Sequence, residues 1–255
     1  MKIAVSGKGG VGKTTLSSLL ARYWARKGYR VLAVDADPDA NLGSALGIDT
    51  SGIVPVAKME ALITERTGLK PGTVGGFFKM NPKVDDLPEA LGRERDGVRL
   101  LIMGTVKKGG GGCVCPESVL LKALISHLVL YQKDLVIMDM EAGIEHLGRG
   151  TAQGVDRLVI VVEPGRRSIE TAAKVKQLTQ DIGLHKVAAV GSKVRNAEQE
   201  EFLRSNLDGI QLIGILPFSE EIARADLESR PPHLDDPQIF QAIEKIAAAL
   251  DSETA

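Results

Sequence analysis

Short apolar runs alternate along this chain with longer stretches that have the spacing of amphipathic helices. The apolar runs are rich in Val and Ile and are continuous, which is typical of strands buried on both faces of a sheet. They cover residues 2–6, 31–35, 99–104, 134–140, 157–163, 186–192 and 211–217. The helical stretches cover residues 13–27, 117–131, 168–182, 198–207 and 237–250. This alternation predicts an α/β fold, with a mostly parallel sheet of about seven or eight strands flanked by helices.

The stretch from residue 51 to residue 96 has neither pattern. It holds scattered Gly and Pro, which predicts loops with short helices packed at the edge of the sheet. The chain has no internal repeat, no low-complexity linker and no break in composition. We therefore expect residues 1–255 to form one domain.

Composition narrows the range of partners. The 255 residues include 33 acidic and 32 basic side chains, for a formal net charge of −1, so a surface for non-specific nucleic-acid binding is not expected. No apolar run approaches the ~18 residues of a membrane span, and Gly7 interrupts the first residues too soon for a signal peptide. These features predict a cytoplasmic protein with no membrane or nucleic-acid partner.

Residues 7–14 read Gly-Lys-Gly-Gly-Val-Gly-Lys-Thr and fit the phosphate-loop pattern G-x-x-x-x-G-K-[ST]. The motif follows an apolar strand and opens a helix, where backbone N–H groups and the helix dipole favour bound phosphate. Lys13 is expected to reach the β- and γ-phosphates, and the Thr14 hydroxyl to bind Mg²⁺. The residues expected to contact nucleotide here are Gly9, Gly10, Val11, Gly12, Lys13, Thr14 and Thr15.

Carboxylates follow two of the predicted strands. Asp35, Asp37 and Asp39 come at the end of the second apolar run, and Asp139 comes near the end of the fourth. Because open α/β sheets bind ligands beyond the carboxyl ends of their strands, we expect these acids beside the phosphate loop. An Asp after an apolar strand can hold Mg²⁺ through water, which is the role predicted for Asp139.

Lys8 places a second lysine in the loop, and the sequence from Lys8 to Thr15 resembles the deviant Walker A motif of the family that includes MinD, ParA and the nitrogenase iron protein. The residues alone leave open that Lys8 is a solvated surface lysine. The resemblance implies that Lys8 contacts the nucleotide of a partner subunit across a homodimer. There it would stabilise charge on the transferred phosphoryl group.

Two later segments extend this resemblance. Residues 35–41 look like the family's switch I, which implies that Asp39 orients or activates the attacking water and that Asp37 lies near Mg²⁺ through water. Residues 139–145 look like its switch II, in which the N–H of Gly143 senses the γ-phosphate. Glu141 stands where the family often has proline.

The base pocket is implied by resemblance at two further loops. Ser192 stands where relatives carry an Asn that reads adenine, and Asn196 is either its substitute or the N-cap of a helix. Leu216, Pro217 and Phe218 resemble the loop that covers the base. The resemblance therefore implies ATP and ADP as the bound nucleotides.

The two cysteines, Cys113 and Cys115, stand in C-x-C spacing ahead of a predicted helix. A position near a helix N-terminus lowers the pKa of a thiol and favours metal binding, although a buried thiol pair or a transient disulfide would use the same residues. Structural Zn²⁺ takes four ligands, and no His has a spacing that pairs it with the thiols. Two chains meeting at this loop would supply four thiolates, a set that suits Zn²⁺ and can also bind Ni²⁺.

The C-x-C pair and the switch II sequence together resemble a narrower group, the CooC-type ATPases that mature nickel-containing carbon monoxide dehydrogenase. The resemblance covers nearly the whole chain. It implies a nucleotide- and metal-dependent homodimer that hydrolyses ATP and helps to insert nickel, with carbon monoxide dehydrogenase as its protein target.

Two other classes of protein remain open. The acidic, weakly amphipathic end of the chain and its neutral charge disfavour a MinD- or ParA-like positioning ATPase. An iron–sulfur carrier of this superfamily usually has C-x-x-C, and the reductase needs two cysteines far apart. This sequence has neither pattern.

Overall fold

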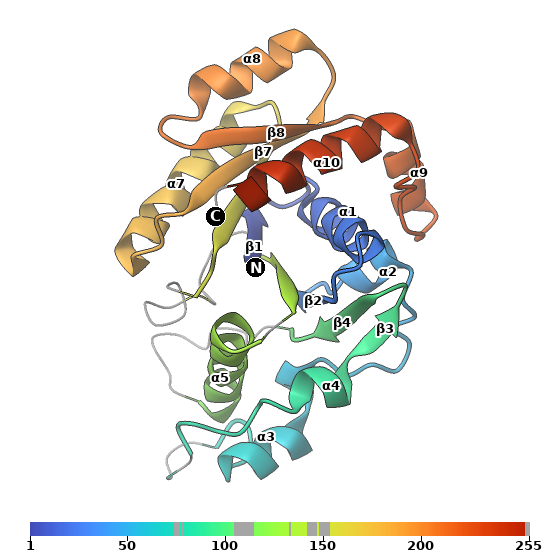
Figure 1. Ribbon diagram of the computed structural model, residues 1–255. Coiled ribbons are helices and arrows are strands. Elements are labelled where there is room, and N and C mark those ends of the chain that lie inside the picture. The colour runs from blue at the N-terminus through green and yellow to red at the C-terminus, as the bar shows by residue number, and fades with distance from the viewer. Residues whose placement is uncertain are drawn as a thin grey trace.

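An eight-stranded sheet forms the centre of the protein in the computed structural model, which describes residues 1–73, 77, 79–104, 115–132, 134–141, 147 and 154–252. The strand order is β3-β4-β2-β5-β1-β6-β7-β8 (Figure 1). The strands are β1 (Lys2–Gly7), β2 (Val31–Ala36), β3 (Arg93–Arg95), β4 (Val98–Ile102), β5 (Leu135–Met140), β6 (Arg157–Val162), β7 (Val187–Val194) and β8 (Gln211–Pro217). All neighbouring strands run parallel except β3 and β4. The predicted α/β fold with a mostly parallel sheet is confirmed.

The four central strands, β2, β5, β1 and β6, are buried along their whole length, as their continuous apolar sequences predict. Asp139 of β5 is level with Asp35 of β2 on one side and with Val5 of β1 on the other. Gly7, the last residue of β1, is level with Val161 of β6. The carboxyl ends of these strands therefore bring the phosphate loop and two acids to one edge of the sheet.

Helices cover both faces of this sheet (Figure 1). One apolar core, which includes the buried Trp24, lies under α1 (Lys13–Arg26), α2 (Leu42–Leu46) and α10 (Pro237–Ser252). The helices packed on the opposite core are α3 (Glu60–Thr67), α4 (Leu87–Leu91), α5 (Pro116–Leu130), α7 (Arg166–Ile182) and α8 (Ala197–Asn206). The 3₁₀ helix η1 (Val56–Lys58) joins this second core. α1 is thus held against the sheet directly behind the phosphate loop.

Besides the five-residue helix α2, two elements have no counterpart in the sequence prediction. β3 is exposed and charged, so it has no apolar run, and it pairs with β4 across a turn at Asp96 and Gly97, both of which have positive φ. An Asp-Gly pair is a common hairpin signal and could have revealed this strand. The other element is α9 (Glu220–Leu227), which begins after Ser219, a residue whose side chain caps the helix.

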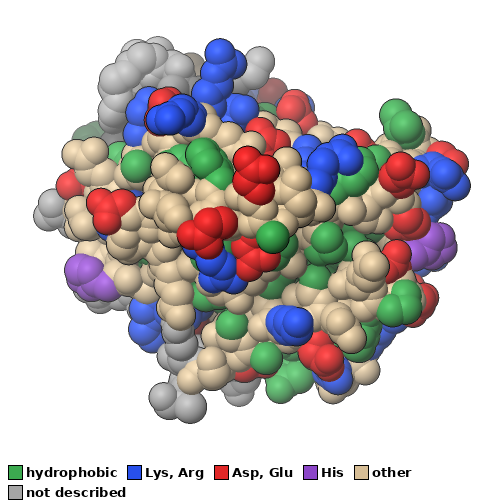
Figure 2. Space-filling model, turned by 90° about the horizontal axis from the view of Figure 1, so that it is seen from above, with side chains coloured by type: hydrophobic (Ala, Val, Ile, Leu, Met, Phe, Trp, Pro, Cys, Tyr) green, Lys and Arg blue, Asp and Glu red, His purple; other side chains and the backbone are tan. Residues whose placement is uncertain are grey.

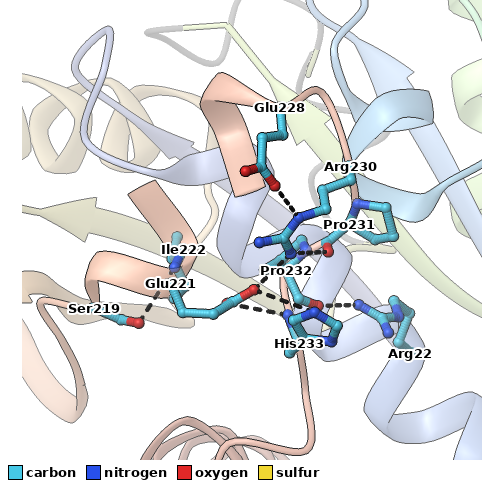
Figure 3. A network of polar contacts seen from close by, with 9 residues as sticks. All are labelled: Arg22, Ser219, Glu221, Ile222, Glu228, Arg230, Pro231, Pro232 and His233. Carbon is cyan, nitrogen blue, oxygen red and sulfur yellow. Dashed lines mark hydrogen bonds and ion pairs between the residues drawn. The ribbon is translucent and has the colours of Figure 1, made fainter. Parts of the chain in front are cut away.

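A polar network ties the connection between α9 and α10 to α1 (Figure 3). Arg230 donates to the Glu221 carboxylate at 2.7 Å, and the backbone N–H of His233 donates to the same carboxylate at 3.1 Å. Arg22 of α1 donates to the carbonyl oxygen of Pro232. These contacts hold residues 228–236 on the outer surface of α1.

Acidic, basic and apolar side chains are interspersed on the face drawn in Figure 2. This mixture agrees with the formal net charge of −1. Within the described ranges, no helix is long and apolar enough to cross a lipid bilayer.

Candidate functional site

The phosphate loop connects the end of β1 to the start of α1. Gly12 occupies the N-cap position of α1 with φ +96°, and its carbonyl accepts the N–H of Leu16 at 2.9 Å. A Cβ at Gly12 would lie 3.0 Å from the Ser192 hydroxyl, so both the backbone angle and the space favour glycine. No described side chain caps α1, which leaves the N–H groups of its first turn available to an anion.

Lys13, the first residue of α1, is buried against the loop. Its ammonium lies 3.5 Å from the carbonyl oxygen of Lys8. Val11 is fully buried and anchors the loop in the core, whereas Gly9 and Gly10 are exposed. The loop therefore has a fixed base and an accessible rim, and the ammonium of Lys13 can add positive charge to phosphate bound there.

Asp139 is a buried carboxylate beside this loop. Its Oδ1 accepts the hydroxyl of Ser17 at 3.3 Å, and its Oδ2 is buried with no hydrogen-bond partner among the described residues. The pKa of Asp139 is raised to about 7, chiefly by burial and also by the nearby Asp35 and Asp37, against the opposing effects of the Thr14 hydroxyl and Lys13. A buried oxygen without a partner is costly, and a bound cation would satisfy it.

These observations fit a Mg²⁺ ion, which prefers oxygen ligands and keeps several waters. Thr14, Asp37 and Asp139 are the side chains that would hold it, together with phosphate oxygens and water. No three His, Cys, Asp or Glu side chains in the described part of the chain form a metal cluster by themselves.

The acids of switch I differ in burial. Asp35 is fully buried, and its carboxylate accepts the N–H of Asp37 at 3.2 Å and the N–H of Leu42 at 2.9 Å. Burial raises the pKa of Asp35 to about 6, and the two backbone hydrogen bonds oppose that rise. Asp39 is exposed, and its N–H donates to Asp37 at 3.0 Å. The structure thus separates a buried acid, Asp35, from two acids that are accessible to a ligand.

Lys8 forms an ion pair with Glu163, at 3.4 Å, in the same chain. The side chains are 38% and 31% exposed. Glu163 directly follows β6, the neighbour of β1, so strand order brings it to the phosphate loop. The sequence prediction did not include Glu163, although an acid immediately after a buried strand is a recognisable signal.

The carboxyl end of β7 and the residue that follows it contact the phosphate loop and the expected base pocket. Lys193, at φ +57°, donates to the carbonyl of Gly10 at 2.6 Å. The guanidinium of Arg195 lies 3.5 Å from the ring centroid of Phe218, which follows Pro217 at the end of β8. Neither Lys193 nor Arg195 was among the predicted site residues. Both lie beside residues that were.

Asn196 is the N-cap residue of α8. Its side-chain oxygen accepts the N–H of Gln199 at 2.9 Å. Ser192, the other candidate for the base, is almost fully buried against Gly12. Of the two roles that the sequence left open for Asn196, the capping contact is the one made in this structure.

We expect Asn196→Ala to destabilise the protein by about 1 kcal/mol, the usual cost of losing an N-cap, with little change in ATP affinity. Urea unfolding and titration with a fluorescent ATP analogue would measure the two quantities. A large loss of affinity without a loss of stability would instead place Asn196 in the base pocket.

Cys115 is the N-cap residue of α5 and is half-buried. Its thiol lies 3.0 Å from the hydroxyl of Ser118. The thiol thus stands at a helix N-terminus, as the sequence predicts. Cys113 and Gly143 lie outside the described residues, so their roles remain predictions.

Comparison with known proteins identifies the family. Residues 2–232 match the family described as the CobQ/CobB/MinD/ParA nucleotide binding domain. The carbon monoxide dehydrogenase accessory protein CooC of Rhodospirillum rubrum is 47% identical over 229 residues, which are 89% of this chain and 87% of that protein. This chain is a CooC-type member of the MinD/ParA superfamily. The resemblance carried by the deviant phosphate loop and the C-x-C pair is thereby confirmed.

Other members of the superfamily agree in sequence length and fold. A protein of Methanocaldococcus jannaschii described as an uncharacterized ATP-binding protein is 45% identical, over 96% of both chains. The MinD cell division protein of Aquifex aeolicus has the same fold, with a TM-score of 0.69 over 99% of this chain and 98% of that one, at 22% identity. Because this family consists of nucleotide-binding domains, we expect the nucleotide to bind at the phosphate loop that follows β1.

Proposed function

We propose that this protein is an ATP-hydrolysing maturation factor that acts as a homodimer and assists nickel insertion into carbon monoxide dehydrogenase. The observation that carries the proposal is the 47% identity to CooC, an accessory protein of that enzyme. The chain also has the thiol pair, Cys113 and Cys115, that a metal-handling protein needs. ATP or ADP with Mg²⁺ would occupy the phosphate loop, and Zn²⁺ or Ni²⁺ would be held between the two subunits.

The residues around the phosphate loop have separate roles in the proposed phosphoryl transfer. Lys13 and the first N–H groups of α1 bind the phosphates. Asp139, Asp37 and Thr14 would hold Mg²⁺, which would neutralise charge on the phosphate oxygens. The exposed carboxylate of Asp39 orients the attacking water. The N–H of Gly143 responds to the presence of the γ-phosphate.

Lys8 must leave Glu163 before it can reach the nucleotide of a partner subunit. The ion pair is about one-third exposed, and such pairs contribute only about 0–1 kcal/mol. A triphosphate in the seam between two chains offers Lys8 a more highly charged partner, so ATP favours the dimer. Metal binding by thiols of both chains favours the same dimer, and the two effects must be reciprocal.

We expect Lys8→Ala to retain nucleotide binding and to lose hydrolysis by at least about 10²-fold, because charge stabilisation from the partner is absent. Phosphate release and nucleotide titration would measure this. Lys186→Ala is the matched control, since Lys186 is exposed and immediately precedes β7, at the opposite end of the sheet from the phosphate loop. Normal hydrolysis by Lys8→Ala would show that Lys8 does not act across the dimer.

We expect native mass measurements to find one Zn²⁺ or Ni²⁺ per two chains. Cys115→Ala removes two of four ligands from the shared site, and structural Zn²⁺ sites with a full ligand set bind with about 10–16 kcal/mol. Metal affinity should therefore fall by at least about 10²-fold, while ATP affinity is unchanged. Ser118→Ala, which keeps the thiol and removes its neighbour, is the control. Two ions per two chains would contradict a shared site.

A further inference from the structure

Lys193 is the extra residue of a β-bulge near the carboxyl end of β7. Ser192 is level with Leu216 of β8 and Val194 is level with Pro217, so Lys193 lies between the two pairs, where the register shifts. Its φ is +57°, in the left-handed region that glycine favours and that other residues adopt at a cost in free energy. Bulges beside functional sites often redirect a side chain, so we asked what the side chain of Lys193 contacts.

The backbone on both sides of Lys193 is held in place. Ser192 is almost fully buried, and the carbonyl of Val194 accepts the N–H of Phe218 at 2.9 Å. The guanidinium of Arg195 lies 3.5 Å from the ring centroid of the same Phe218. A strained residue persists only where its surroundings fix it, and such residues cluster at functional sites. These contacts therefore fix the point from which the Lys193 side chain extends.

The side chain of Lys193 reaches the exposed rim of the phosphate loop, where its ammonium donates to the carbonyl of Gly10 at 2.6 Å. Gly10 has φ +79°, and a Cβ there would meet nothing within 4 Å, so packing does little to hold this part of the loop. The N–H of Val11 donates to the carbonyl of Lys8 at 3.4 Å. The contact from Lys193 is therefore the shorter of these two hydrogen bonds at the rim.

The orientation of the peptide groups in this rim matters for a bound anion. A phosphate loop binds phosphate through backbone N–H groups that converge on it, and a carbonyl oxygen turned toward the phosphate would repel it. Consecutive glycines, Gly9 and Gly10, allow these peptide groups to rotate easily. An ammonium bound to the Gly10 oxygen forms a charge-assisted hydrogen bond that keeps this peptide group in one orientation.

We propose that Lys193 is a positioning residue for nucleotide binding. It holds the Gly10 carbonyl so that the N–H groups of the phosphate loop stay directed at the bound phosphates, and it acts through the loop without touching the nucleotide. This role rests on the proposed function only for nucleotide binding. It requires neither the metal nor the partner subunit.

Two variants of Lys193 and one control test this role. Lys193→Met removes the ammonium and keeps an unbranched side chain, whereas Lys193→Arg keeps the charge and the N–H donors. Lys176→Met is the matched control, because Lys176 of α7 also donates to a backbone carbonyl, that of Asp208 at 2.9 Å. Isothermal titration with ADP and with a non-hydrolysable ATP analogue would measure the affinities.

We expect Lys193→Met to bind ADP and the ATP analogue more weakly by the same factor, at least about fivefold, because both nucleotides use the same loop. Lys193→Arg should restore both affinities to within about twofold of the wild type, and Lys176→Met should bind like the wild type. A larger loss for the ATP analogue than for ADP would show that Lys193 contacts the γ-phosphate itself. That result, or wild-type affinities in Lys193→Met, would overturn the proposal.

Amide hydrogen exchange without nucleotide gives a second readout that is independent of binding. The amides of Gly9, Gly10 and Val11 should exchange at least about threefold faster in Lys193→Met than in the wild type or in Lys176→Met. Exchange in β5 should be the same in all three proteins, which separates a local effect from a loss of global stability. Unchanged exchange in the loop would overturn the role of Lys193. Failure of the wild type to bind nucleotide would instead refute the proposed function, and the exchange rates would still decide whether Lys193 holds the loop.

Discussion

Replacing Asp139 with Asn is expected to stabilise the nucleotide-free protein above pH 7 and to abolish hydrolysis. The pKa of Asp139 is about 7 in the folded protein against an ordinary value of 3.8, chiefly because of burial. The folded state therefore holds this proton more tightly than the unfolded state does. The contribution of Asp139 to the free energy of unfolding is fully present below about pH 4 and is lost as the pH rises through about 7.

The size of this effect follows from the shift in pKa. The rise in the pKa of Asp139 from 3.8 to about 7 corresponds to a loss of up to about 4 kcal/mol in the free energy of unfolding at high pH. Asp35, with a pKa of about 6, lowers the free energy of unfolding in the same direction between about pH 4 and pH 6. Asn at position 139 has no charge to bury and keeps an oxygen for the hydroxyl of Ser17. We expect it to raise the free energy of unfolding by about 2 kcal/mol or more at pH 8, and to have little effect at pH 4.

The same substitution removes the carboxylate that the cation needs. We expect hydrolysis to fall by at least about 10²-fold, or about 2.7 kcal/mol of transition-state stabilisation. Urea unfolding at several pH values and a phosphate-release assay would measure the two effects. Asp85→Asn, at an exposed carboxylate, should leave both unchanged. An Asp139→Asn protein with the wild-type pH profile of stability would show that the buried acid is not protonated near neutral pH.

The features that could be predicted from the sequence are those that depend on neighbours in the chain. A strand, a glycine-rich turn and a helix follow one another between Lys2 and Arg26, so the phosphate loop can be predicted from the order of residues alone. The positions of the acids at the ends of β2 and β5 can be predicted for the same reason. Their common location follows from a general property of parallel sheets, which expose the carboxyl ends of their strands at one edge.

Contacts that depend on the order of strands in the sheet could not be predicted in this way. Glu163 lies beside Lys8 from 155 positions away, and Lys193 reaches Gly10 from 183 positions away. The first contact requires β6 to lie next to β1, and the second requires β7 to follow β6 in the sheet. Alternating strands and helices allow several orders. The burial of Asp35 could not be predicted for a different reason. Asp35, Asp37 and Asp39 lie close together in the sequence, and their order does not indicate which of the three is buried.

Replacing Gly7 with Ala is expected to destabilise the protein by about 3 kcal/mol, at the upper end of the cost of overpacking. A Cβ at position 7 would lie 2.4 Å from the carbonyl oxygen of Val161, and φ is +146°, which side chains rarely adopt. Val161 belongs to β6, in the middle of the sheet, so its backbone cannot move away without breaking the pairing with β1. The phosphate loop begins at this residue, and we expect nucleotide affinity to fall by at least about tenfold as the loop is displaced.

Gly9→Ala is the control for stability, because nothing lies within 4 Å of a Cβ there. Equal urea midpoints for the two variants would show that the contact between β1 and β6 can relax around a methyl group.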